Sequence, residues 1–374
     1  YSETSPMCQY VVQNSETWVI PVMNPDGYSS NSRYNANGID LNRNLSYMWQ
    51  PGGGGGSNPF SEPETCALRN LTMTAWPAQN SYENPFCASL SMHGGEACFN
   101  YVWNYSSAAV QDTLLIVDMA ERYADLCQVP GFWVTEGWAW YVITGDVNDW
   151  SYGEYGGIDH TVEVHVDKQA SDWPGVAAQH YMSILDFFEN AVSGIWGTVT
   201  DGYGQPLDAN LQVTMWDGGD SQPLRFCRTD VTMGDYMKPT LPGTYSVTAT
   251  VSGYPPQTVS DVAVAAGQRV EVSFVFGVQG SPGSEGGRYG PVSLGISPNP
   301  SSGPVTFSCS SPEGCILEVF DLSGRTVYES EIPPGAVELE WDFTGRCGVL
   351  PSGIYLAGLS SRGESVSRLL VLER

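Results

Sequence analysis

The stretches HTVEVHV, residues 160–166, and GVAAQHYMSILDFFENAV, residues 175–192, decide the fold of the first half of the chain. The first stretch is short and β-branched, which is typical of a strand, and the second has the length and apolar spacing of an amphipathic helix. Upstream, WVIPVM (residues 18–23) and CASLSMH (residues 87–93) are expected strands, and AAVQDTLLIVDMAERYADLC (residues 108–127) is an expected helix. This alternation predicts an α/β domain with a largely parallel or mixed sheet over residues 1–193.

The rest of the chain, from residue 194 onward, has the sequence pattern of β-strands instead of alternating strands and helices. From residue 194 to 276, short alternating strands punctuated by Gly and Pro predict a small β-sandwich. The run GVQGSPGSEGGRYGP, residues 277–291, is typical of a flexible linker. Residues 292–374 form a second expected all-β domain. Its predicted strands include VTFSC, CILEVFD, VELEWDF, GIYLAGL and SRLLVLE.

Composition narrows the class of protein. The chain has 374 residues, which is enough for two or three domains, and 41% of them are hydrophobic, which is enough to build cores. Its formal net charge is −26. A surface this acidic repels nucleic acid and anionic membranes and suits a soluble extracellular protein. No apolar run is long enough for a transmembrane segment.

The start of the chain and the cysteines give further expectations. The first ten residues lack the hydrophobic segment of a signal peptide, and the chain begins without Met, so we infer that sequence upstream of Tyr1 is missing. None of the nine cysteines stands in a CxxC pair, which disfavours a zinc ribbon. Cys309 and Cys315 flank a short turn and predict a hairpin disulfide. The odd total leaves at least one thiol unpaired or bonded to missing sequence.

Residues 24–44, NPDGYSSNSRYNANGIDLNRN, combine two arginines with many asparagines. Such a polar segment does not build a core, and closely spaced Arg and Asn donors are suited to hold a carboxylate. The alternative is an ordinary solvated loop. The glycine run at residues 52–56 is an expected flexible surface loop, and its lack of a GK[ST] ending argues against nucleotide binding.

Four histidines and one glutamate carry the remaining candidate chemistry. The segments beginning at His93 and His160 both read HxxE, but neither is expected to be helical, so neither is a self-contained zinc pair. His93 ends a strand before two glycines and is well placed for ligation; a hydrogen-bonded histidine is the alternative. Glu163, in the apolar strand TVEV, suits a general base with a raised pKa, unless it faces water at a strand edge. His180 lies in an expected helix and is assigned a structural role.

These motifs resemble the zinc metallocarboxypeptidase family of the carboxypeptidase A, B, D and E type. NPDGY, RYNANGIDLNRN, PFSEPET, SMHGG and YVITGDVNDWSY stand in the order of the family and cover residues 15–193. The resemblance implies that His93 is the third zinc ligand and that Glu163 is the general base. It further implies that Arg33 polarises the scissile carbonyl.

The resemblance assigns the other substrate contacts as well. It implies that Asn42 and Arg43 bind the terminal carboxylate of a peptide and that Tyr141 closes over the substrate. Asn104 and Asn148 fall where the family lines the pocket for the C-terminal side chain. Two neutral amides there suggest a preference for neutral or polar residues, although the nearby Asp146 could reverse that preference.

The chemistry implied is hydrolysis by a zinc-activated water, whose pKa the metal lowers to about 7. The first two zinc ligands of the family come from an HxxE motif upstream of NPDG, and no histidine precedes Asn24 in this chain. We therefore expect those ligands, and with them Zn²⁺ binding, to depend on the missing upstream sequence. The activity of this truncated chain itself is left open.

The two β domains resemble modules found elsewhere. GTVTDGYGQPL, residues 197–207, resembles the start of a transthyretin-like or carboxypeptidase-regulatory domain. The last domain, with SPNPSSG and LPSGIYLAGL, resembles a bacterial C-terminal sorting or Ig-like module. This predicts a secreted or cell-surface bacterial protein that meets secretion machinery through its last domain.

We therefore expect a zinc carboxypeptidase acting on peptides or proteins with a free C-terminus. The alternatives are an inactive surface binding or adhesion protein and an amidase acting on peptidoglycan-type amides. A purely structural β-rich surface protein is disfavoured by the order of the motifs in the first domain.

Overall fold

The computed structural model forms two compact units. Unit 1 comprises residues 1–199 and 206–274, and unit 2 comprises residues 200–205 and 275–374. The structure describes residues 5–74, 81–82, 85–217, 219–277, 293–299, 301–311, 314–321, 325–345, 348–361 and 364–372. Nearly all of the linker expected at residues 277–291, and Cys347, lie outside the described residues.

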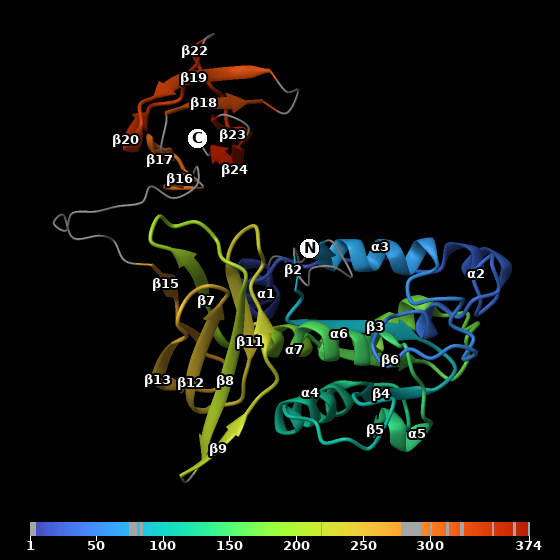
Figure 1. Ribbon diagram of the computed structural model, residues 1–374. Coiled ribbons are helices and arrows are strands. Elements are labelled where there is room, and N and C mark those ends of the chain that lie inside the picture. Colours follow the sequence, from blue (N-terminus) through green and yellow to red (C-terminus); the bar gives the residue numbers. More distant parts are fainter. Residues whose placement is uncertain are drawn as a thin grey trace. The chain divides into compact units, whose positions relative to one another are not determined.

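A four-stranded sheet organises the first half of unit 1. Its order is β3 (Ala88–His93), β6 (Ile158–Val164), β4 (Ala97–Tyr101) and β5 (Trp133–Glu136). β3 pairs parallel with β6, β6 antiparallel with β4, and β4 parallel with β5. This is the mixed sheet of the predicted α/β fold (Figure 1).

Helices cover this sheet where the apolar periodicity predicts them. The two long helices are α4 (Thr113–Leu126) and α7 (Trp173–Ala191), which contact each other, and α4 also contacts β4 and β5. Their shared core includes Phe99, Tyr123, Val162 and Phe187, each almost fully buried. The shorter helices are α1 (Pro6–Asn14), α2 (Pro25–Ser30), η1 (Leu41–Arg43), α3 (Pro63–Thr72), α5 (Gly137–Trp140) and α6 (Val147–Tyr155). A small pair, β1 (Met73–Thr74) and β2 (Ser81–Tyr82), completes the region.

The strand predicted at WVIPVM is wrong. Residues 15–23 are irregular and form no ladder with any strand in the part of the chain that the structure describes. Trp18 is 51% exposed and Val19 77% exposed. A strand needs a neighbour to accept and donate backbone hydrogen bonds, and Pro21 has no N–H to contribute. An apolar pattern alone does not supply that neighbour.

The second half of unit 1 is the predicted β-sandwich. One sheet has the order β10 (Cys227–Arg228), β8 (Ala209–Asp217), β12 (Gly243–Val251) and β13 (Gln257–Val264), with β9 (Asp220–Pro223) paired to β8. The other has the order β11 (Asp235–Pro239), β7 (Gly194–Asp201) and β14 (Arg269–Glu271), with β15 (Phe274–Phe276) paired to β7. The inward residues of β8 and β12, such as Val213 and Val247, are fully buried, as the alternating pattern requires.

A buried ion pair joins the sandwich to the α/β region. Lys238 of β11 lies 3.0 Å from Asp112, the residue before α4, and both side chains are fully buried. Asp112 also accepts from the Tyr152 hydroxyl at 2.9 Å and from the backbone N–H of Arg225 at 3.2 Å. The Arg225 guanidinium in turn donates to the backbone carbonyls of Tyr152 and Gly153 in α6. These contacts fix the two halves of unit 1 together.

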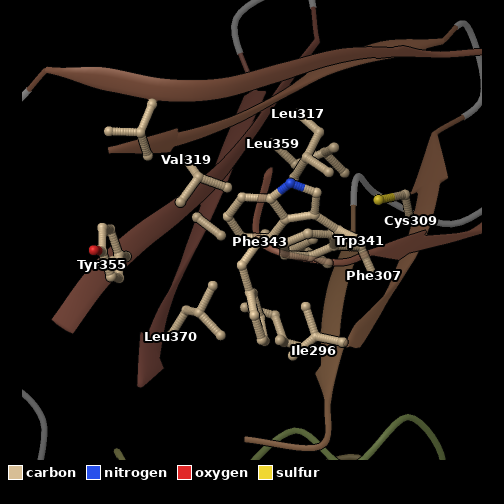
Figure 2. Packing of buried hydrophobic residues seen from close by; sticks show 14 of the residues in the cluster. Ile296, Phe307, Cys309, Leu317, Val319, Trp341, Phe343, Tyr355, Leu359 and Leu370 are labelled. Carbon is tan, nitrogen blue, oxygen red and sulfur yellow. The ribbon is translucent and has the colours of Figure 1, made fainter. Parts of the chain in front are cut away.

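Unit 2 contains a second β-sandwich. One sheet has the order β16 (Ser293–Ser297), β17 (Val305–Ser311) and β20 (Gly335–Trp341). The other has the order β19 (Thr326–Ile332), β18 (Cys315–Phe320), β23 (Gly353–Ser361) and β24 (Glu364–Leu372), and β21 (Thr344–Gly345) pairs with β22 (Gly348–Val349). Figure 2 shows the core between the sheets, where Trp341 lies among Phe307, Phe343 and Leu359.

The disulfide predicted between Cys309 and Cys315 is absent, because both thiols are free in the structure. Cys309 lies in β17 and Cys315 begins β18, and these strands belong to different sheets. Strands β17 and β18 therefore do not form a hairpin.

Among the helices that the structure describes, none combines the length and the apolar character that a bilayer crossing requires.

Candidate active site

Strand β6 places its polar residues on one face. Asp159, Thr161 and Glu163 alternate with His160 and Val162, so the two sets point to opposite faces of the sheet. In the parallel pairing, His93 of β3 stands opposite Glu163, and Ser91 stands opposite Thr161. The two residues that carried the strongest chemical expectations are therefore cross-strand neighbours.

Burial shapes the charge of both neighbours. Burial, reinforced by the positive charge of Arg33, lowers the pKa of His93 to about 4, so its imidazole is neutral at pH 7. Burial raises the pKa of Glu163, and the nearby charges of Lys168 and Arg33 oppose that shift. Glu163 Oε2 is buried and has no hydrogen-bond partner among the residues that the structure describes. The pair therefore offers a neutral nitrogen ligand beside a carboxylate with free acceptor capacity.

The polar run brings Arg33 to this face through Asp40. Arg33 Nε donates to Asp40 Oδ2 at 2.7 Å, and Asp40 Oδ1 accepts from the backbone N–H of Asn42 at 3.1 Å. One carboxylate thus orients the arginine and caps the short helix η1 that carries Asn42 and Arg43. Asp40 has a supporting role that the sequence did not single out.

Asn42 has a fixed amide orientation. Its Oδ1 accepts from the backbone N–H of Val147, the first residue of α6, at 3.0 Å. The amide NH₂ group is therefore turned the other way, and Asn42 lines the pocket described below. Arg43 Nη1 donates to the Asn42 carbonyl at 2.6 Å, and the charge of Arg43 acts on both His93 and Asp146.

Other asparagines of the run are structural. Asn35 and Asn37 each donate to Glu62, at 2.7 and 2.8 Å. Asn44 is fully buried and donates to the carbonyls of Gly55 and Asn58. The glycine run is anchored by these bonds: its first residues are exposed, as predicted, but Gly55 is buried and a Cβ there would overlap the Arg43 carbonyl.

The far wall of the site follows helix α5. Tyr141 comes directly after α5, is 45% exposed and contacts the neighbouring Trp140 ring edge-to-face. Its backbone N–H donates to the Gly137 carbonyl at 3.1 Å. An exposed phenol at the edge of a pocket has room to change rotamer, which a closing residue needs.

These elements enclose one pocket. It is lined by Arg33, Asn42, His93, Asn100, Asn104, Gly137, Trp140, Tyr141, Ile143, Thr161 and Glu163. Six of the eight candidate residues from the sequence line it. Arg43 lies beside it, and Asn148 is fully buried behind Asn100 and Thr161, to which its amide is hydrogen-bonded.

Some lining residues carried no recognisable signal in the sequence. Asn100 and Thr161 follow from strand alternation once Glu163 is placed, since they belong to neighbouring strands β4 and β6. Trp140 could not be predicted to line the pocket, because its position depends on the short helix α5. Lys168, whose charge acts on both His93 and Glu163, lies in a loop that no motif marks.

The other histidines stay outside the pocket. His160 is fully buried against Phe99 and Phe187 on the opposite face of β6. His180 bonds the Tyr123 hydroxyl at 3.0 Å and the Val164 carbonyl at 2.9 Å, which fits the structural role expected for it. Both HxxE segments are non-helical, as predicted, so neither forms a self-contained metal pair.

The described residues do not form a complete metal site. Among the described residues, no three His, Cys, Asp or Glu side chains converge to hold an ion. His93 alone supplies a suitable neutral nitrogen at the pocket. The described residues therefore do not fit a three-ligand zinc site on their own.

Three domain families are found in order along the chain. Residues 1–183 match the zinc carboxypeptidase family, residues 194–277 match the carboxypeptidase regulatory-like domain, and residues 295–373 match the secretion system C-terminal sorting domain. The match of residues 1–183 to the zinc carboxypeptidase family agrees with the resemblance seen in the sequence motifs.

The chain is also similar in sequence to individual carboxypeptidases. Carboxypeptidase D of Anas platyrhynchos is 29% identical over 309 residues, which cover 73% of this chain and 20% of that protein. The carboxypeptidase N catalytic chain of Mus musculus is 28% identical over 349 residues, covering 74% of this chain and 70% of that protein. The chain spans about a fifth of the length of carboxypeptidase D.

Solved structures include a carboxypeptidase A from Helicoverpa armigera, with a TM-score of 0.38 and 20% identity, covering 46% of this chain and 50% of that chain.

Proposed function

We propose that the chain binds peptides by their free C-terminal carboxylate and hydrolyses the last peptide bond in a zinc-dependent reaction. The observation that carries this proposal is the shared pocket. There the donors of Arg33 and Asn42 converge on the same space as His93 and Glu163. A carboxylate-binding set beside a desolvated acid–imidazole pair suits hydrolysis at a chain end.

Each side chain has a role in this proposal. Asn42 and Arg43 hold the terminal carboxylate, and Arg33 donates to the carbonyl oxygen on which negative charge develops. Tyr141 closes over the bound residue from its exposed position. Glu163 accepts the proton of the attacking water, because its buried Oε2 has no competing donor in the described structure. Asn104 lines the side-chain pocket, and Asn148 supports it from behind.

Zinc would supply Lewis-acid chemistry at His93. Since the described residues provide one candidate ligand, a three-ligand site needs two further protein donors. We therefore propose His93 as one ligand of the metal.

Zinc titration of the full-length protein, followed in parallel by hydrolysis of a short peptide with a free C-terminus, tests the proposal. Stoichiometric zinc uptake with release of the C-terminal amino acid is expected. A folded protein that takes up zinc and is inactive on every free-C-terminus peptide would overturn the hydrolase part.

A second function is favoured by the presence of only one candidate metal ligand among the described residues of the pocket. A protein with this substrate clamp and no metal would bind peptide C-termini without cleaving them, as a surface binding or adhesion protein does. Tight peptide binding with no zinc uptake and no turnover would identify this case. Release of an amine from peptidoglycan-type amides, with no activity on peptides, would instead indicate an amidase.

The domain organisation and location follow the same proposal. We assign residues 1–193 to catalysis, 194–276 to a transthyretin-like accessory domain, 277–291 to a linker and 292–374 to sorting. The match to a secretion system sorting domain supports a secreted or cell-surface bacterial protein whose last domain meets the secretion machinery. The net charge of −26 supports the absence of a nucleic-acid partner.

A further inference from the structure

The amide of Asn104 is held in one orientation. Asn104 lines the pocket, and its Nδ2 donates to Asp146 Oδ1 at 2.7 Å. The same oxygen accepts from the backbone N–H of Asp149 at 3.2 Å. Because Asp146 Oδ1 already accepts a hydrogen bond from a backbone N–H, it is expected to accept from Asn104 too, and the NH₂ group of Asn104 therefore faces it. The carbonyl oxygen of Asn104 must then point elsewhere.

That carbonyl oxygen points toward Gly137, which also lines the pocket. A Cβ at Gly137 would overlap Asn104 Oδ1, so the absence of a side chain at Gly137 makes room for this oxygen. The wall of the pocket at Gly137 is thus occupied by a hydrogen-bond acceptor.

The backbone of Asn104 is held from both sides as well. Its N–H donates to Asp149 Oδ1 at 2.8 Å, and its carbonyl accepts from the Ile143 N–H at 3.1 Å. Asp146 and Asp149 are themselves fully buried. Because the residue is only 3% exposed and anchored at three points, its side chain is preorganised before any ligand arrives.

We propose that Asp146 is a positioning residue for side-chain specificity, which fixes Asn104 so that the pocket prefers C-terminal residues ending in a hydrogen-bond donor. This inference rests on the proposed function, since it concerns the side chain of the residue bound there. A donor such as the amide of Gln or the ammonium of Lys pairs with Asn104 Oδ1. An apolar side chain offers that oxygen no donor, which a preorganised polar site penalises strongly.

The test uses four peptides that differ only in the C-terminal residue: Gln, Lys, Met and Glu. Binding affinity by calorimetry and kcat/KM for hydrolysis are both measured on the zinc-supplemented protein. The Gln and Lys peptides should exceed the Met peptide by at least about tenfold, with Glu weakest. Gln far above Lys would identify a neutral amide as the preferred donor, and Lys far above Gln a cation.

The decisive variant is Asp146→Ser. Serine still caps α6 by accepting from the Asp149 N–H, but it is too short to reach Asn104. The ratio of Gln to Met should therefore fall toward one in this variant. Because both peptides are measured on the same protein preparation, partial unfolding of the variant does not change the ratio of Gln to Met. As a second variant, Asn104→Leu should reverse the preference in favour of Met.

The matched control is Asp172→Ser. Asp172 caps α7 by accepting from the Gly175 N–H, outside this pocket, and its replacement should leave the Gln-to-Met ratio unchanged. Equal binding of all four peptides by the unaltered protein, or an unchanged ratio in Asp146→Ser, would overturn the inference. Binding preference without turnover would keep the inference and reject the hydrolase function, and no binding of any peptide would reject both.

Discussion

Glu163 and His93 show how burial sets the chemistry of single residues. The two side chains are neighbours across a parallel strand pair, and burial favours the neutral form of each. A neutral imidazole keeps its lone pair, and a carboxylate with a raised pKa accepts a proton more readily. The positive charges of Lys168 and Arg33 oppose this upward shift in the pKa of Glu163.

Replacing Glu163 by Gln should lower kcat by at least about a hundredfold, because the isosteric amide cannot accept the proton of water. Peptide binding and zinc uptake should be unchanged, since neither needs that proton transfer. Glu121→Gln, on the exposed face of α4, is the control and should leave kcat unchanged. Full activity of Glu163→Gln would remove Glu163 from the role of base.

At the scale of elements, β6 explains why one strand carries both the site and its support. Its alternation puts Glu163 at the pocket and Asp159 deeper on the same face, where Ser89 donates to it from β3. Burial raises the pKa of Asp159 to about 7. The same strand thus carries a carboxylate at the pocket, Glu163, and a buried one, Asp159, that is protonated in mildly acidic solution.

Asp159 should make the free energy of unfolding depend on pH. Between the unfolded pKa of about 3.9 and the folded value near 7, the folded state holds more protons, so stability should fall as pH rises through this range. Asp159→Asn removes this contribution. Urea titrations of both proteins should show the variant gaining stability relative to the unaltered protein as pH increases from about 4 to 7. A constant difference across that range would contradict the raised pKa.

At the scale of the whole molecule, unit 1 joins two domains through the buried pair of Asp112 and Lys238. The pair sits between the start of α4 and β11, and Arg225 adds bonds to α6. Removing one partner of a buried pair leaves an uncompensated charge, which is costly.

Lys238→Met should therefore destabilise unit 1 by about 3–5 kcal/mol, measured by urea unfolding. Arg122→Gln breaks the more exposed pair with Asp186 and should cost only about 1 kcal/mol or less. Similar costs for the two variants would show that the Asp112–Lys238 pair does not hold the domains together.

Much of the secondary structure could be predicted from the sequence, because the local spacing of apolar residues determines it. Helices α4 and α7 and strand β6 follow from apolar spacing, and alternation along β6 already separates His160 from Glu163. The strand expected at WVIPVM failed because pairing depends on a neighbour that no local pattern encodes. The disulfide expected between Cys309 and Cys315 failed because a short turn does not reveal that the chain changes sheets.

The candidate site could likewise be predicted only in part. The order of the motifs brought Arg33, Asn42, His93 and Glu163 together, and the structure places all four on one pocket. The supporting bonds of Asp40 and the orientation that Asp146 gives Asn104 join residues far apart or in separate loops. Those contacts depend on tertiary packing and could not be read from spacing.

The most direct test of the account compares matched peptides with a free and an amidated C-terminus, in the unaltered protein and in Arg43→Ala. The unaltered protein should bind the free form at least about tenfold more tightly, because the proposed function has Asn42 and Arg43 hold the terminal carboxylate. Arg43→Ala should lose most of that difference, while Arg69→Ala, a control arginine in α3, should keep it. Equal binding of the two peptides by the unaltered protein, or an undiminished difference in Arg43→Ala, would contradict recognition of a peptide C-terminus.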